Sequence, residues 1–202
     1  GFLLAEMEYF GTKKGRMPFP FPEGRLGGRA FSVAVLHQWF GVPTSGCSIR
    51  RTLAERFLPW FEGEAEWKLR ADDLLIWGSE IAGGIKYHIA NPPIRYRVHS
   101  RNGFCGTPKL SPEKWRNRCR SAAEFSEMVM RKNRLNWLDL LEKENRNGGI
   151  LPDKRLLALL KLGRERMISG KDFFRALFSL LRDRIRKPPR LFSGKESAAN
   201  HV

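Results

Sequence analysis

The stretch from residue 71 to residue 84 constrains the fold most, because it predicts a buried helix with a defined start and a defined end. Apolar side chains occupy most of its positions: Leu74, Leu75, Ile76, Trp77, Ile81 and Ala82. A helix that is apolar on several sides is normally surrounded by other elements. Asp72 and Asp73 fall in the first turn, where unpaired N–H groups and the helix dipole favour carboxylates. Gly83-Gly84 are expected to end the helix.

A strand with two chemically different faces follows. Period-two alternation places Ile94, Tyr96 and Val98 on one face, and Arg95, Arg97 and His99 on the other. The first face suits a core. The second lines up two guanidinium groups and an imidazole, which suit a diphosphate or a metal-bound anion. A separate strand is expected over residues 86–90, with a break at Asn91-Pro92-Pro93 between the two strands.

Short, mixed elements precede the helix. We expect a strand over residues 1–10, an irregular loop rich in Gly and Pro over 11–28, and a helix over about 28–40. Pro43-Thr44-Ser45-Gly46 is typical of a turn. A strand over 47–49 and a helix over 52–57, ending before Pro59, are expected next.

From Ser111 onward the pattern is helical. Four helices are expected, over about 111–132, 136–144, 152–163 and 171–186. Because the composition changes near Thr107, we place a domain boundary there, with an α/β domain at 1–106, a helical C-terminal region at 107–192 and a disordered tail at 193–202. The predicted fold class is α/β.

The charge is strongly positive, with 37 Lys and Arg against 21 Asp and Glu, a net charge of +16. Such a balance favours a polyanionic partner, whether nucleic acid, an anionic membrane face or a nucleotide diphosphate. The 3 cysteines have an odd count and no metal-like spacing, which is typical of a reducing compartment. No apolar run is long enough to span a membrane. The expected localisation is cytoplasmic, with a peripheral position at the inner membrane face as an option.

Five short motifs, in this order, resemble the acceptor half of a bacterial family 2 glycosyltransferase with a GT-A fold. They are Pro43-Thr44-Ser45-Gly46, Arg50-Arg51, Leu58-Pro59, Ala71-Asp72 and the run Tyr96-Arg97-Val98-His99-Ser100-Arg101-Asn102. The resemblance covers residues 25–105 well, and the helical region only in general character. It implies inverting transfer of a sugar from a nucleotide-sugar donor to a hydroxyl of a glycan, lipid-linked or protein acceptor, as in surface polysaccharide synthesis.

The resemblance also assigns roles to residues. It implies that Asp72 is the base that deprotonates the acceptor hydroxyl; Asp73, at a position that looks apolar in such enzymes, is second choice. The alternative is that Asp72 only caps a helix. It implies a phosphate clamp at Arg97 and a metal ligand at His99; the alternative there is an edge strand with solvated charges.

The resemblance further implies that Ser45 and Gly46 border the donor sugar or the acceptor through their backbone. Arg50 and Arg51 are candidates for phosphate or acceptor contacts, or else a surface pair at a helix start. A complete enzyme of this type also needs a nucleotide-binding half and an Asp-x-Asp motif for a divalent metal, Mg²⁺ or Mn²⁺. The chain has no Asp-x-Asp. We therefore expect that half to lie upstream, and the isolated chain to be inactive.

Two other kinds of partner are compatible with the sequence. The charge, the Arg-rich helices and the 6 tryptophans are compatible with an RNA-binding or ribosome-associated protein. However, no RNA-binding motif of known spacing is present, which makes nucleic acid the less favoured partner. The predicted helix over 171–186 has a basic, amphipathic pattern, which favours either a core helix or one that lies on an anionic membrane.

Overall fold

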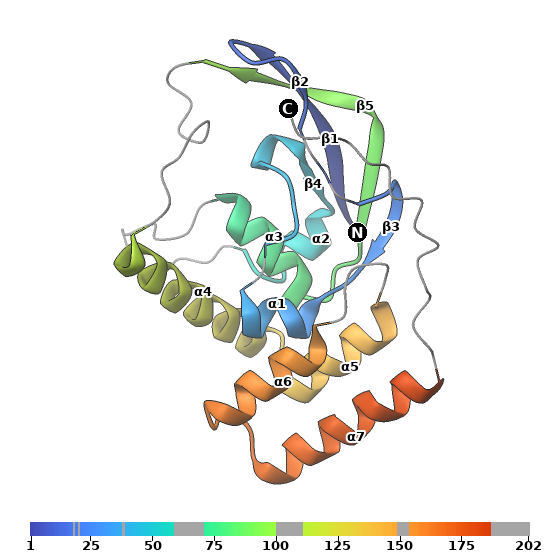
Figure 1. Ribbon diagram of the computed structural model, residues 1–202, viewed down its shortest axis with the longest axis vertical. Coiled ribbons are helices and arrows are strands. Elements are labelled where there is room, and N and C mark those ends of the chain that lie inside the picture. The colour runs from blue at the N-terminus through green and yellow to red at the C-terminus, as the bar shows by residue number, and fades with distance from the viewer. Residues whose placement is uncertain are drawn as a thin grey trace, which may run out of the picture.

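A five-stranded mixed sheet lies at one end of the fold, and helices gather at the other (Figure 1). The computed structural model describes the following residues: 1–17, 19, 21–37, 39–58, 71–99, 111–148 and 154–186. The mixed α/β class predicted from the sequence is confirmed. The expected tail over 193–202 and the proposed boundary near residue 107 lie outside the described residues.

The sheet is built around a parallel pair of long strands. Its strands are β1 (Phe2–Gly11), β2 (Gly15–Arg16), β3 (Gly24–Gly27), β4 (Cys47–Ile49) and β5 (Lys86–Val98). The order is β2-β1-β5-β3, and β4 also pairs with β1. The β1–β5 pair is parallel, and the other pairs are antiparallel. The strands expected over residues 1–10 and 47–49 are confirmed.

The break expected at Asn91-Pro92-Pro93 is wrong, because β5 is one strand from Lys86 to Val98. Its pairing with β1 shifts register between Ala5 and Met7, and the Cα partners resume at Ile94. The two prolines therefore fall in the irregular part of the ladder, where their missing N–H groups remove no paired hydrogen bond.

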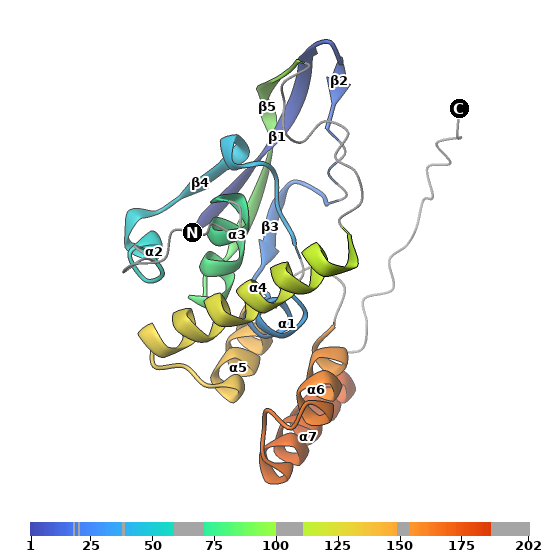
Figure 2. The same cartoon turned by 90° about the vertical axis from the view of Figure 1, so that its left-hand side faces the viewer.

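Seven helices and one 3₁₀ turn are described. They are α1 (Ala30–Leu36), η1 (Thr44–Gly46), α2 (Arg51–Ala54), α3 (Ala71–Ile81), α4 (Pro112–Lys132), α5 (Trp137–Asn147), α6 (Arg155–Arg164) and α7 (Gly170–Arg186). The α3 helix ends as predicted: Gly83 has φ +87°, and its N–H donates to the Glu80 carbonyl at 2.8 Å. Figure 2 shows α6 and α7 side by side, at the end of the molecule away from the sheet.

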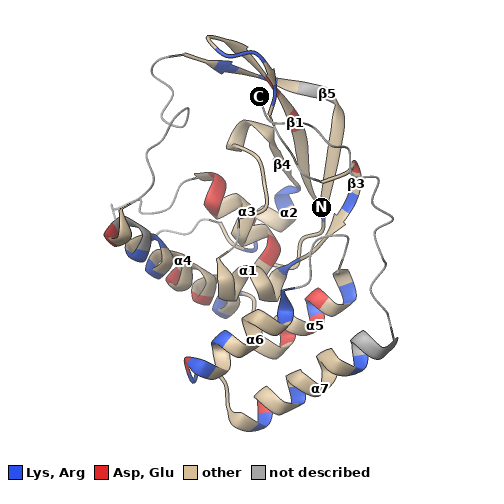
Figure 3. Ribbon diagram, viewed as in Figure 1, with Lys and Arg blue, Asp and Glu red and all other residues tan. Residues whose placement is uncertain are grey.

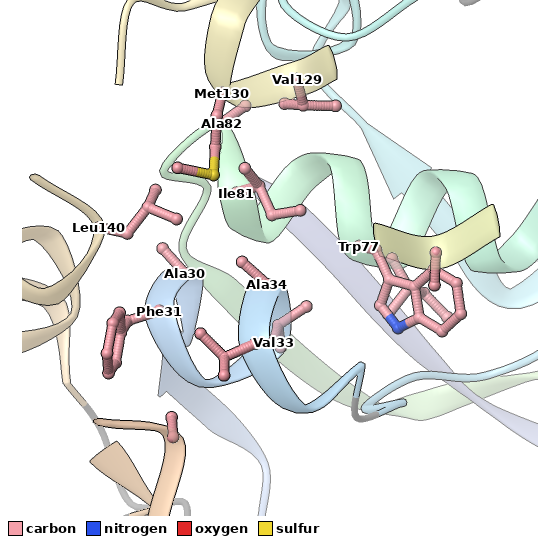
Figure 4. Packing of buried hydrophobic residues seen from close by; sticks show 14 of the residues in the cluster. Ala30, Phe31, Val33, Ala34, Trp77, Ile81, Ala82, Val129, Met130 and Leu140 are labelled. Carbon is pink, nitrogen blue, oxygen red and sulfur yellow. The ribbon is translucent and has the colours of Figure 1, made fainter. Parts of the chain in front are cut away.

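The core is continuous from the sheet to α6 and α7. In Figure 4, four side chains of α1 lie among side chains from the end of α3, from Ala82 directly after it, and from α4 and α5. The α1 residues are Ala30, Phe31, Val33 and Ala34, and their neighbours include Ile81, Val129, Met130 and Leu140. All of these side chains are buried. The α3 helix is buried along almost its whole length, as its apolar composition predicts. Because α3 packs against α1 and α4, its first turn is anchored in the core.

Charged side chains are also buried, at the start of α1. The N–H of Arg29 donates to Glu80 Oε2 at 2.6 Å, and Lys86 Nζ lies 2.9 Å from Glu80 Oε1. Ser32 donates to Glu144 from its N–H at 2.8 Å and from its hydroxyl at 2.7 Å. Burial raises the pKa of Glu144 above its ordinary value, although the Ser32 hydrogen bonds oppose the increase. This cluster joins α1, α3, α5 and β5.

Candidate functional site

The Pro43–Gly46 motif forms a tight 3₁₀ turn against the sheet. The Gly46 N–H donates to the Pro43 carbonyl at 2.8 Å, while Ser45 is exposed and Gly46 is buried. A Cβ on Gly46 would lie 2.6 Å from Val42 Cγ2 and 3.2 Å from the Ala5 carbonyl oxygen. Only glycine fits this position, because any larger side chain would push the turn away from β1. The exposed Ser45 backbone is thus held at a fixed place.

Asp72 lies in the first turn of α3, next to this motif. The η1 turn and α3 are in contact, and the Asp72 charge acts on the thiol of Cys47, directly after the turn. Burial raises the pKa of Cys47 to about 11, and the nearby Asp72 carboxylate adds to the increase, against an opposing effect of Lys86. Asp72 itself is 8% exposed. The protonated thiol is therefore a poor nucleophile at neutral pH, whereas the carboxylate borders the turn.

Asp73 points elsewhere and is fully buried. Both of its carboxylate oxygens accept hydrogen bonds from Nη2 of Arg118 on α4, at 2.7 and 2.9 Å. The Asp73 N–H in turn donates to Asp72 Oδ1 at 3.1 Å. This ion pair ties the first turn of α3 to α4, and so fixes the backbone that carries Asp72.

A pocket of about 470 Å³ lies beside this ion pair. Its lining includes the rings of Trp39, Phe40 and Trp77 and the cationic side chains of Arg118 and Lys154. The Arg118 guanidinium carbon lies 5.7 Å from the centre of the Trp77 ring. Aromatic faces next to cations suit a ligand with an apolar face and an anionic or hydroxyl-rich edge.

Arg50 and Arg51 lie at the other end of β4 from the turn. Arg50 is exposed, and its N–H donates to the Gly1 carbonyl at 3.2 Å. Arg51 pairs with Glu55 one helical turn later, at 2.7 Å, and its side chain is 91% exposed. The alternative of a surface pair at a helix start therefore describes Arg51, and the structure does not bring Arg50 to the Asp72 turn.

Arg97 and His99 lie where β5 ends. The predicted alternation is confirmed: Val98 is buried and Ile94 and Tyr96 are half-buried, whereas Arg95, Arg97 and His99 are exposed. Arg97 is the register partner of Phe10 on β1. The last part of this motif, Ser100 to Asn102, lies outside the described residues. The basic face is thus accessible at the edge of the described structure.

A divalent metal has no evident place among the described residues. No group of three or more His, Cys, Asp or Glu side chains that could hold an ion occurs in that part of the chain. His99 could supply a single ligand, which is fewer than a protein site for such an ion uses. The described residues alone therefore do not fit the implied metal.

Sequence reasoning missed two residues of this region. They are Arg118, which binds Asp73, and His37. His37 ends α1 with φ +51° and lines the pocket. Burial, with a smaller effect of Lys161, lowers its pKa to about 4. Neither could be found from spacing, because both depend on contacts between distant segments.

Comparisons of the chain with protein-family models, with curated proteins and with solved structures find no match.

Proposed function

We propose that the chain forms the acceptor side of an inverting glycosyltransferase site, with Asp72 as the general base. One observation carries the proposal. Pro43-Thr44-Ser45-Gly46 and Ala71-Asp72, which lie far apart in the sequence, are adjacent in the fold, with Cys47 in the field of the Asp72 carboxylate. Motifs that belong to one site must lie close together in the fold, whereas motifs that match by chance need not.

The reaction would use the two motifs as follows. The acceptor hydroxyl oxygen attacks the anomeric carbon of the donor sugar, and its proton passes to the Asp72 carboxylate. The bond between the anomeric carbon and the diphosphate oxygen breaks, so the nucleoside diphosphate leaves with the electron pair. The fixed backbone around Ser45 and Gly46 would border the sugar.

The neighbouring groups would support this chemistry without reacting. The Asp73–Arg118 ion pair positions the first turn of α3, which makes Asp73 a positioning residue in this proposal. The pocket with Trp39 and Trp77 would accept the apolar face of an acceptor sugar ring. Arg97 on the exposed face of β5 would meet the donor diphosphate. The nucleotide and its divalent metal would need residues other than those described.

The test contrasts the two neighbouring aspartates. The coding DNA upstream of Gly1 is read, and the whole reading frame that contains the chain is expressed and supplied with nucleotide sugars. Transfer to an acceptor, or hydrolysis of the donor, is then measured. We expect Asp72→Asn to lower the rate by about 10²- to 10⁴-fold and to leave the melting temperature nearly unchanged.

Asp73→Asn is the matched control, because it removes a charge one residue away. It leaves the half-buried Arg118 guanidinium without its carboxylate, so we expect it to lower the melting temperature measurably. The 202-residue chain by itself is expected to transfer no sugar. Full activity of Asp72→Asn would overturn the assignment of the base. If the whole reading frame ignored every nucleotide sugar and bound RNA with steep salt dependence, the glycosyltransferase proposal would be wrong.

A further inference from the structure

The α7 helix carries apolar side chains over more of its surface than the fold covers. Its inner side packs on α6, with Ala176 and Leu180 buried. Phe174, Phe178 and Leu181, in contrast, are 57%, 69% and 45% exposed. We call these three side chains the α7 apolar face. Large exposed apolar groups on one side of a helix usually mark a contact surface.

Helical geometry shows that this face extends well beyond the packed side of the helix. At about 100° per residue, Phe174, Phe178 and Leu181 fall within roughly 60° of one another. The buried Ala176 and Leu180 are centred more than about 120° away. Half-buried Phe173 and Leu177 lie between the two sets and pack against the core. The α7 apolar face therefore continues the apolar side of the helix beyond the part that the fold covers.

Basic residues border the α7 apolar face on one side. Lys171, Arg175 and Arg182 are all exposed and lie roughly 50–90° around the helix from its centre. In Figure 3, Lys and Arg positions, drawn in blue, recur along α7. Asp172 is the single acidic residue from 170 to 182. It lies toward the opposite side and is engaged by Ser169, whose hydroxyl donates to Asp172 Oδ2 at 2.8 Å.

This arrangement matches a helix that lies flat in a lipid interface. Such a helix places phenylalanine and leucine below the headgroups and lysine and arginine among them. The net charge of +16 adds a general attraction to an anionic surface. In Figures 1 and 2, α7 lies at the end of the molecule opposite the sheet, so a flat membrane can reach it without covering β5. Within the described ranges, no helix is long and apolar enough to cross a bilayer.

We propose that α7 docks on an anionic lipid surface through its apolar face, with Lys171, Arg175 and Arg182 bound to lipid phosphate or carboxylate groups. This inference does not depend on the proposed glycosyltransferase activity, because it uses none of the residues near Asp72. Charge complementarity favours lipid as the occupant, because the three cations lie along one border of the apolar face, where they would meet an anionic plane together.

The test measures binding of the 202-residue chain to vesicles by sedimentation. Vesicles of phosphatidylcholine with about a third of phosphatidylglycerol are compared with pure phosphatidylcholine vesicles. We expect binding only to the anionic vesicles. Lys171→Gln, Arg175→Gln and Arg182→Gln should each weaken the binding by about fivefold at low salt, since one basic residue near such a surface contributes about 1 kcal/mol.

The apolar contribution is tested by a triple variant, Phe174→Ser, Phe178→Ser and Leu181→Ser. We expect it to lose at least tenfold in vesicle affinity and to keep its melting temperature, because the three side chains are exposed. The matched control is Leu3→Ser with Tyr87→Ser, which removes apolar side chains that are 37% and 38% exposed on the sheet. This control should bind vesicles normally.

Three outcomes would overturn the proposal. One is unchanged vesicle binding by the triple variant. Another is loss of binding when residues 187–202 are removed while the triple variant still binds, which would assign the contact to that segment. The third is a stable dimer in solution that the triple variant abolishes, with no affinity for anionic vesicles, which would assign the α7 apolar face to self-association.

Discussion

Removing the buried ammonium of Lys86 should be among the most damaging single changes in this chain. Its Nζ lies 2.9 Å from Glu80 Oε1 and donates to the Phe40 carbonyl at 2.7 Å, and both charged side chains are at most 1% exposed. Lys86→Met is similar in volume, so it leaves little cavity. It does leave a buried carboxylate without its cation.

The size of the effect follows from desolvation. Breaking a buried pair by removing one partner destabilises by about 3–5 kcal/mol, and the unpaired Phe40 carbonyl adds about 1 kcal/mol. Glu80→Gln should destabilise by a similar amount, because it leaves the Lys86 ammonium unpaired. The double variant removes both charges of this pair, and its amide still accepts from the Arg29 N–H. We therefore expect it to destabilise by only about 1–3 kcal/mol.

Urea unfolding of the four proteins, followed by circular dichroism, gives the coupling energy directly. We expect the double variant to be more stable than the sum of the single effects by at least about 3 kcal/mol. Arg51→Met, which breaks the exposed pair with Glu55, is the control and should change stability by less than about 0.5 kcal/mol. A Lys86→Met effect below about 1 kcal/mol, or strict additivity, would refute the reasoning.

Two further changes test other parts of the fold. The folded pKa of His37, about 4, lies below the ordinary 6.5, so the unfolded chain binds the proton more tightly and stability should fall as the pH drops from 6.5 to 4. His37→Asn tolerates the same backbone and should remove about 3 kcal/mol of this pH-dependent loss of unfolding free energy. Urea titrations across the pH range measure it, and parallel pH profiles of the two proteins would contradict the prediction. Asn136→Ala removes the cap that accepts from the Leu138 and Asp139 N–H groups at 2.9 and 3.0 Å, and should lower the unfolding free energy by about 1–2 kcal/mol. Glu142→Ala on the exposed face of α5 is its control, with a change within about 0.5 kcal/mol, and equal effects of the two variants would count against the cap.

Local signals predicted several elements well, but they missed β2 and β3, which lie in the stretch over 11–28 that was expected to be an irregular loop. The apolar run after Asp73 and the Gly83-Gly84 pair predicted α3, and the alternation from Ile94 to Val98 predicted the faces of β5. Pro112 and the periodicity after it predicted α4 from its start to Lys132. These cases succeed because periodicity, caps and helix-ending glycines act within a few residues. The Pro92-Pro93 error shows the limit, since a register shift depends on the partner strand.

The candidate site was predicted only in part. The sequence named Asp72, Ser45 and Gly46, and the fold brings their segments together. Only the resemblance ranked Asp72 above Asp73, because the structural difference between them lies in Arg118, 45 residues further on. The sequence could not foresee that Lys86 and Glu144 are buried, since residues of these types are mostly exposed and only a distant partner makes burial tolerable.

The start of α1 has consequences for the order in which the chain can assemble. This helix has no side-chain cap of its own, and its first amides are bound by carboxylates 51 and 112 residues away. No local segment can therefore complete α1 during synthesis; it must wait until α3 and α5 have arrived. A nick between residues 100 and 110 would not release an independently folded first part, because that part would lack Glu144. The α1 amides should accordingly exchange their hydrogens only through opening of the whole molecule.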